Sequence, residues 1–387
     1  MRRLISIFFL ILLVFPLQTR TFAKAELELT LKSDAAILLD SETNAVLFSK
    51  NPDKKMYPAS VTKIATAIYA IEKGNLNSIA TVSANAERQD GTRVYLVAGE
   101  KVSLLQLIRG MLINSGNDAA VAVAEQVDGS VEQFSKNINE YLKTTVGVKN
   151  THFVNPSGLF DKNHYTTARD MALITDYAIK NPIFAEIFGT KKFHWKSKSW
   201  DTNILSHHKM LLGEIPYAGI TGGKTGYTTE SKQTLSTTAG NGKIKLTAVV
   251  LKSDLQRDKY DDTGKLFDFG FKSFHNSTIK QGEIFKKGTK EFYPENDTLV
   301  TESVQGAVRD LSDNGLLTFK NNQGEILQTV QLKTLEPKPA PAPAPKKDAD
   351  TKENEQPGYE RNIIFGLFIF AFAFIVIGTA KKITKKY

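Results

Sequence analysis

Three short motifs hold the side chains of this sequence that are best suited to covalent chemistry. Residues 60–63 form an S-x-x-K motif, residues 115–117 read S-G-N, and residues 224–226 read K-T-G. A serine hydroxyl is a weak nucleophile and needs a base beside it. Residues three apart on a helix share a face, so Lys63 can reach the hydroxyl of Ser60. The first motif therefore predicts a serine nucleophile with a lysine base.

Each motif also has an ordinary structural interpretation. A lysine accepts a proton only where burial and neighbouring cations lower its pKa. Ser115 and Asn117, separated by a glycine, can face one cavity, but a loop that caps a helix would look the same. Lys224, Thr225 and Gly226 suit a strand that binds a carboxylate through charge, a hydrogen bond and close approach; a glycine-rich turn is the alternative. The order and the separation of the three motifs together favour the catalytic interpretation over the structural one.

S-x-x-K, S-D-N and K-T-G in this order are the signature of penicillin-binding proteins and class A β-lactamases. The sequence resembles that superfamily, with S-G-N in place of S-D-N. Longer segments, among them YPASVTKIATA, NSGNDAAVAVAEQVDGS, NTHFVNPSGLFDKNHYTTARDMALI and GITGGKTGYT, resemble the low-molecular-mass penicillin-binding proteins that are D-alanyl-D-alanine carboxypeptidases. The resemblance runs from about residue 34 to residue 268.

The resemblance implies a role for each catalytic position. Ser60 would be the nucleophile that forms the acyl-enzyme, and Lys63 would take its proton. Ser115, helped by Lys224, would pass a proton to the departing D-alanine nitrogen.

The resemblance assigns the remaining positions to substrate binding. Asn117 would bond a peptide amide, while Lys224 and Thr225, with Gly226 allowing close approach, would hold the terminal carboxylate. The N–H groups of the nucleophile and of Tyr227 would form the oxyanion hole. A further candidate for charge near the carboxylate is Arg257.

The implied activity is removal of the terminal D-alanine from peptidoglycan pentapeptides, with penicillin acylating the same serine. The expected partners are stem peptides ending in D-Ala-D-Ala and β-lactam antibiotics, with no cofactor and no nucleic acid. The chain has no cysteine, which excludes thiolate metal sites, and its six histidines follow no metal-binding pattern, so no metal is expected. Much of the net charge of +9 lies at the two ends of the chain, and no basic stripe suggests nucleic-acid binding.

Three other functions stay open at this point. A serine β-lactamase of class A needs a glutamate for deacylation, and no glutamate occurs between Glu140 and Glu186. A wall-binding protein with a decayed site would not need every catalytic position to be present. Transpeptidase or endopeptidase activity would use the same motifs with a different acceptor or bond.

The expected fold class is α+β, with an antiparallel sheet sandwiched by helices, as the resemblance implies, over residues 26–275. Apolar periodicity predicts helices, and turn residues between apolar runs predict hairpins. The predicted helices are 60–73 (ending at Gly74), 103–113 (opening with a capping box) and 118–126; the predicted hairpins are 36–39 with 45–48 and 235–239 with 244–251. Short apolar runs between glycine- and asparagine-rich turns predict a small all-β domain at 276–335.

The two ends of the chain predict export and anchoring. Residues 1–25 have the basic, apolar and A-x-A regions of a signal peptide. Residues 362–380 carry no charge, are long enough to span a bilayer, and are followed by a lysine-rich tail at 381–387 that the positive-inside rule places in the cytoplasm. The proline- and alanine-rich linker at 336–361 would hold the catalytic domain away from the membrane. We therefore expect a cell-membrane protein with a single C-terminal span and an extracellular catalytic domain that faces the cell wall.

Overall fold

The computed structural model describes residues 29–306 and 308–335, which belong to one compact unit. The predicted signal peptide, the linker, the membrane anchor and the basic tail lie outside these residues and stay predictions. Within the described part of the chain, no helix is both long and apolar enough to cross a membrane.

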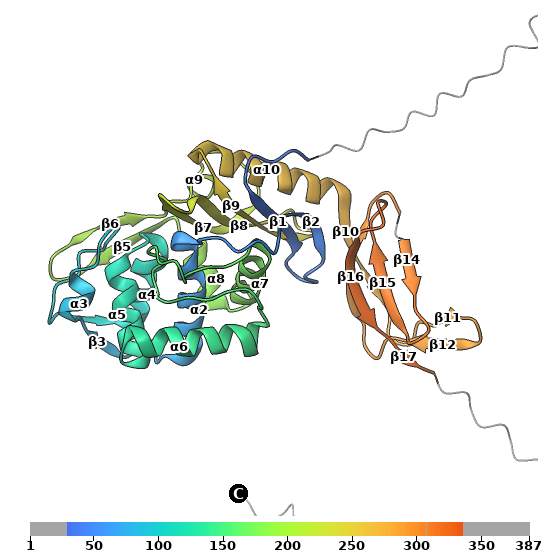
Figure 1. Cartoon of the computed structure of the whole chain (residues 1–387), viewed down its shortest axis with the longest axis horizontal. Coiled ribbons are helices and arrows are strands. Elements are labelled where there is room, and N and C mark those ends of the chain that lie inside the picture. The colour runs from blue at the N-terminus through green and yellow to red at the C-terminus, as the bar shows by residue number, and fades with distance from the viewer. Residues whose placement is uncertain (1–28, 307, 336–387) are drawn as a thin grey trace, which may run out of the picture. The chain divides into compact units, whose positions relative to one another are not determined.

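A five-stranded antiparallel sheet is the centre of the first domain (Figure 1). The strand order is β2-β1-β9-β8-β7. The strands are β1 (Ala35–Asp40), β2 (Val46–Lys50), β7 (Ile220–Thr228), β8 (Lys232–Gly240) and β9 (Lys245–Ser253). Both predicted hairpins are therefore confirmed, as β1–β2 and β8–β9.

Helices cover both faces of the sheet, as expected. Helix α10 (Gln256–Ser273) packs on one face, and α7 (Ala168–Ile179) packs on the other. Side chains alternate along a strand: Ile37 of β1 packs toward α7, and Leu38 packs toward α10. Burial on both faces explains why β1 is apolar along most of its length instead of alternating.

Helix α2 (Lys63–Lys73) lies inside the helical part of the domain and is buried from Lys63 to Ile71. Its surroundings are α4 (Leu104–Ile113), α5 (Asn117–Asp128), α6 (Val131–Tyr141) and α8 (Pro182–Phe188), together with α7. The shorter elements are a 3₁₀ turn (Ala59–Thr62), α3 (Ala84–Glu87), a π-helical turn (Leu142–Val146), α9 (Lys209–Leu212), β3 (Ile79–Thr81), β4 (Lys101–Ser103), β5 (Lys192–Lys196) and β6 (Asp201–Leu205).

Two helix starts differ in detail from the prediction. The helix predicted from residue 60 begins as a 3₁₀ turn, and α2 proper starts at Lys63. The hydroxyl of Ser103 does cap α4 by accepting from the N–H of Gln106. The reciprocal half of the capping box is wrong, because the Gln106 side chain donates to the carbonyl of Lys196 at 2.6 Å.

The predicted small β domain follows directly from α10. Its strands are β10 (Phe274–Ile279), β11 (Phe285–Lys287), β12 (Lys290–Tyr293), β13 (Thr298–Ser303), β14 (Val308–Leu311), β15 (Leu316–Lys320), β16 (Ile326–Gln331) and β17 (Lys333–Thr334). A small core containing Phe292, Val300 and Phe319 holds them together. The hydroxyl of Thr301 donates to Asp40 of the first domain at 2.8 Å, so the small core has support from its neighbour.

Candidate active site

The structure brings Ser60 and Lys63 into contact at the start of α2. Ser60 lies in the 3₁₀ turn and Lys63 is the first residue of the helix, so the two side chains share a face. Lys63 Nζ lies 3.1 Å from Ser60 Oγ. This is the separation that direct proton transfer between a hydroxyl and an amine needs.

A strained backbone and two glycines shape the approach to Ser60. Ala59 has a φ of 51°, in the left-handed region that residues with a Cβ seldom occupy. A Cβ at Gly158 would lie 1.9 Å from the carbonyl oxygen of Ala59, so only glycine fits beside this turn. A Cβ at Gly226 would lie 2.9 Å from the N atom of Ser60, so glycine lets β7 approach the nucleophile closely.

The amine of Lys63 is fully buried and has two further partners. It donates to Asn117 Oδ1 at 2.7 Å and to the carbonyl of Ser157 at 2.6 Å. Burial, followed by the charge of Lys224, lowers its pKa well below the ordinary value, although Asp118 opposes this. A neutral amine has two N–H groups, and both are occupied, so its lone pair is left for the hydroxyl of Ser60.

A second lysine holds the hydroxyl of Ser115. Lys224 Nζ donates to Ser115 Oγ at 2.9 Å and to the carbonyl of Thr225 at 2.8 Å. Burial, together with the charge of Lys259, lowers the pKa of Lys224 to about 7. Ser115 itself is left-handed, with a φ of 62°. Strain of this kind persists where surrounding contacts fix the residue, and it is common at functional sites.

Asn117 is bonded to the protein at both ends of its carboxamide. The oxygen accepts from Lys63, and the nitrogen donates to the carbonyl of Asp90 at 2.7 Å. One amide hydrogen is left for a ligand. The structure therefore gives Asn117 a part in holding Lys63 that the sequence did not indicate.

A cleft of about 390 Å³ opens over these groups. It is lined by Ser60, Thr92, Ser115, His207, Thr225, Gly226, Tyr227, Gln233, Gln256 and Lys259. Five of the predicted residues thus reach the cleft surface, while Lys63, Asn117 and Lys224 are buried behind it. None of the lining residues is acidic, so the cleft suits an anionic ligand.

The sequence pointed to the wrong cation on α10. The exposed guanidinium of Arg257 pairs with Asp261 at 2.7 Å and is not part of the cleft lining. Lys259, two residues later and therefore on a different face of the helix, lines the cleft instead and donates to Gln233 Oε1 at 2.7 Å. Burial, followed by the charge of Lys209, lowers its pKa to about 8. Helical spacing puts the two residues on different faces, but contacts with a distant segment decide which face meets the cleft.

His207 is another cleft residue that no motif revealed. Desolvation, together with the charges of Lys224 and Lys63, lowers its pKa to about 4. The imidazole is therefore neutral near pH 7. It precedes the short helix α9 and has no pattern around it that points to a site.

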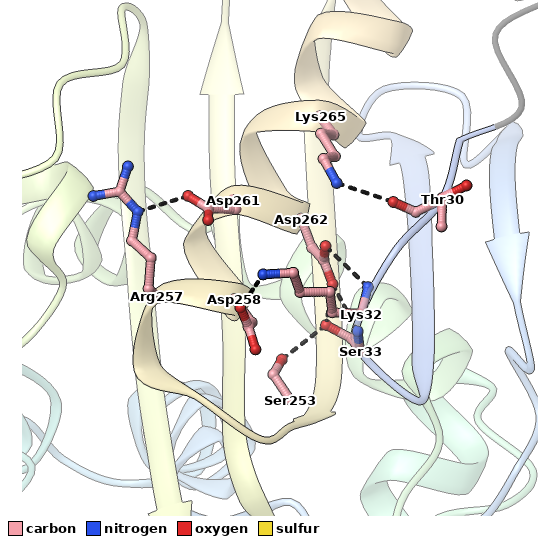
Figure 2. A network of polar contacts seen from close by, with 9 residues as sticks. All are labelled: Thr30, Lys32, Ser33, Ser253, Arg257, Asp258, Asp261, Asp262 and Lys265. Carbon is pink, nitrogen blue, oxygen red and sulfur yellow. Dashed lines mark hydrogen bonds and ion pairs between the residues drawn. The ribbon is translucent and has the colours of Figure 1, made fainter.

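Polar contacts on the far side of α10 fix the helix that carries Lys259 (Figure 2). Asp258 pairs with Lys32 at 2.6 Å, and Asp262 accepts from the N–H of Ser33 at 2.7 Å. These bonds hold the acidic face of the helix against the segment before β1. Lys259, on another face, is consequently directed to the cleft.

Comparisons with known proteins agree with this geometry. The model of the family Peptidase_S11, D-alanyl-D-alanine carboxypeptidase, matches residues 20–254. The chain is 32% identical over 308 residues to the D-alanyl-D-alanine carboxypeptidase DacF of Bacillus subtilis, covering 76% of this chain and 78% of that one. It is 33% identical over 261 residues to the carboxypeptidase DacA of Haemophilus influenzae, covering 64% of each.

Solved structures show the same fold. Penicillin-binding protein 5 from Haemophilus influenzae superposes with a TM-score of 0.68 at 25% identity, over 79% of this chain and 97% of that one. A variant of the Streptomyces K15 DD-transpeptidase superposes with a TM-score of 0.59 at 27% identity, over 62% of this chain and 98% of that one.

Proposed function

The chain belongs to the D-alanyl-D-alanine carboxypeptidase family Peptidase S11, whose members are serine-type and penicillin-binding, and we propose that Ser60 is its nucleophile. Ser60 would remove the terminal D-alanine of peptidoglycan pentapeptides through an acyl-enzyme. The observation that carries this proposal is the arrangement of Lys63, whose two other hydrogen-bond partners leave its nitrogen facing Ser60 Oγ.

Acylation follows from these contacts. Ser60 Oγ attacks the carbonyl carbon of the penultimate D-alanine while Lys63 accepts its proton. The N–H groups of Ser60 and Tyr227 stabilise the oxyanion, and one such donor is worth about 10²–10³ in rate. When the peptide bond breaks, Ser115 gives a proton to the departing nitrogen and is resupplied from Lys224. Water then hydrolyses the ester and returns a proton to Ser60 Oγ, while the proton held by Lys63 passes back to Lys224, so that both lysines regain their starting states.

The lysines in and behind the cleft lining support a substrate with a free terminal carboxylate. Lys224 and Thr225 lie on β7, and Lys259 adds a third donor from α10. Since no acid lines the cleft, a carboxylate would meet no repulsion there. For the same reason no side-chain carboxylate is placed to activate water, so we expect the penicilloyl ester to hydrolyse slowly.

A D-alanine release assay tests this function. The full chain in detergent is incubated with a muramyl pentapeptide that ends in D-Ala-D-Ala, and the peptide mass is followed. Loss of a single alanine is expected with the wild type and with Ser49→Ala, an exposed serine on β2, but not with Ser60→Ala. No loss with a wild type that still binds penicillin would overturn the carboxypeptidase proposal.

Transpeptidation is the second candidate, because the fold also matches a DD-transpeptidase. The acyl-enzyme would be the same, and an amine would replace water as the acceptor. The assay distinguishes the two when glycine is added: a product lengthened by glycine would indicate transfer, and the shortened tetrapeptide alone would indicate hydrolysis.

For the location we propose an exported protein anchored by residues 362–380. The support is the signal-like pattern of residues 1–25 and the uncharged segment followed by lysines. Protease added to wall-stripped cells should release the catalytic domain with an N-terminus near residue 26. Protection of the domain from protease would contradict this topology.

A further inference from the structure

Residues 90–96 form a segment that reaches the cleft at Thr92 and is held by the motif residue Asn117 and its neighbour Asp118. The N–H of Asn117 donates to the carbonyl of Thr92 at 2.7 Å, and its side chain donates to Asp90. The buried Asp118 carboxylate accepts from two more N–H groups of the segment, the closest contact to each being 3.0 Å. The segment is thus held in a set position relative to the catalytic groups, and its Thr92 lies on the cleft surface.

The same segment exposes Tyr95 to solvent in a strained conformation. Tyr95 has a φ of 57° and remains 52% exposed. Its ring meets Trp200 edge-on at 4.9 Å, and the hydroxyl of Ser199 donates to its carbonyl. A left-handed conformation at a bulky residue costs about 1–2 kcal/mol. Because the ring stays half-exposed, its burial does not offset that cost, and the strain therefore points to a binding role.

The guanidinium of Arg93 lies over this ring and has no acidic partner within salt-bridge distance among the described residues. Its Cζ lies 5.4 Å from the centre of the Tyr95 ring. The buried carboxylate of Asp118 feels its charge but is already bonded to backbone N–H groups. Of the other five arginines in the described part, Arg88 also lacks an acidic partner, and four pair with an acid: Arg109, Arg169, Arg257 and Arg309.

A guanidinium oriented by an aromatic face is well suited to bidentate binding of a carboxylate. The cleft itself, with Lys259 in its lining and Lys224 behind its surface, already takes the terminal carboxylate in the proposed function, on which this step rests. We propose that Arg93 and Tyr95 form a second anion subsite, which binds a carboxylate-bearing side chain of the residue that precedes D-Ala-D-Ala.

Matched peptides test the subsite with the full chain. Acetyl-L-Glu-D-Ala-D-Ala and acetyl-L-Gln-D-Ala-D-Ala differ only in one carboxylate, and acetyl-L-Lys-D-Ala-D-Ala reverses the charge. The wild type should show a kcat/KM about five- to tenfold higher for the glutamate peptide than for the glutamine peptide. The lysine peptide should be the poorest substrate.

Variants show whether Arg93 is responsible. Arg93→Gln should bring the glutamate-to-glutamine ratio close to one, and Arg93→Lys should keep part of it because the charge remains. Tyr95→Ala should lower the ratio, since the ring orients the guanidinium. The matched control is Arg88→Gln, an exposed arginine on the same stretch of chain, which should leave the ratio unchanged.

Two outcomes overturn the subsite and leave the proposed function in place. One is equal turnover of the glutamate and glutamine peptides by the wild type. The other is an undiminished ratio in Arg93→Gln. Failure to release D-alanine from any peptide would instead contradict the proposed function itself, so the two failures are distinguishable.

Discussion

Lys63 and Lys224 are the same residue type in two differently built regions of one site. Lys63 is enclosed by protein, with every position around its nitrogen facing Asn117, Ser157 or the nucleophile. Lys224 has two partners, Ser115 and the carbonyl of Thr225. An ammonium has three donors, so Lys224 keeps one for a ligand, whereas Lys63 keeps none.

Burial lowers the pKa of both lysines, so the pKa alone does not separate their roles. The partners do. An amine whose N–H groups are occupied can only offer its lone pair, which suits a base. An ammonium with a free donor beside a cleft suits an anion. The number of N–H donors left without a protein partner, more than the lowered pKa, therefore distinguishes the proton acceptor Lys63 from the anion-binding Lys224.

Replacement of Lys63 is expected to have the largest effect. Lys63→Arg keeps the positive charge but cannot accept a proton near neutral pH. Acylation by penicillin should fall by about 10²–10⁴, the usual contribution of a general base, as measured by the second-order rate of adduct formation. Acylation at near wild-type rate in this variant would show that Lys63 is not the base.

Replacement of Lys224 should act on substrate binding as well as on proton supply. Lys224→Gln removes a charge-assisted hydrogen bond, worth about 1.5–3 kcal/mol. We expect kcat/KM for the pentapeptide to fall at least about tenfold, with KM raised. Thr225→Val should raise KM by less. A loss confined to kcat would contradict the carboxylate-binding role. It would mean that Lys224, like Lys63, acts only in proton transfer.

The pH dependence sharpens the comparison, because the lysines act in opposite protonation states. Activity should rise with pH as Lys63 loses its proton. It should fall again above about pH 7–8, as Lys224 (pKa about 7) and Lys259 (pKa about 8) become neutral and KM increases. Since the charge of Lys259 helps to lower the pKa of Lys224, Lys259→Gln should move the alkaline limb to higher pH. An alkaline limb at the same pH in this variant would contradict the effect of the Lys259 charge on the pKa of Lys224.

The smallest expected effect concerns a buried acid outside the cleft. Burial raises the pKa of Asp176 to about 7, and its Oδ2 has no hydrogen-bond partner in the described part of the chain. The folded chain thus keeps this proton while the unfolded chain loses it near pH 3.8. The free energy of unfolding should therefore decrease from about pH 4 to pH 7. Asp176→Asn should flatten this slope in thermal unfolding, with D-alanine release little changed; an unchanged slope would contradict it.

The sequence predicted the elements and the main site residues because both depend on local patterns. The hairpin of β8 and β9 follows from Gly240 to Gly242, and the contact of Ser60 with Lys63 follows from helical spacing. Contacts between distant segments have no local pattern in the sequence that would predict them. The carbonyl of Ser157 that holds Lys63, and the pairing of Asn117 with Asp90, depend on how loops meet in space.

Lys259 is a cleft residue that sequence analysis missed. Arg257 was the candidate cation on this stretch, but in α10 its guanidinium pairs with Asp261. The direction of the helix is fixed by Asp258 and Asp262, whose partners lie at the other end of the chain. A contact between residues that far apart in the sequence could not be predicted from spacing.

The most direct test of the account is to locate the penicillin adduct. The full chain is acylated with benzylpenicillin, digested with trypsin and mapped by mass spectrometry. The adduct should lie on the peptide of residues 56–63, which contains Ser60 as its only serine, and both the adduct and D-alanine release should disappear in Ser60→Ala. An adduct on another peptide, or D-alanine release by Ser60→Ala, would contradict the claim that Ser60, served by Lys63, is the nucleophile.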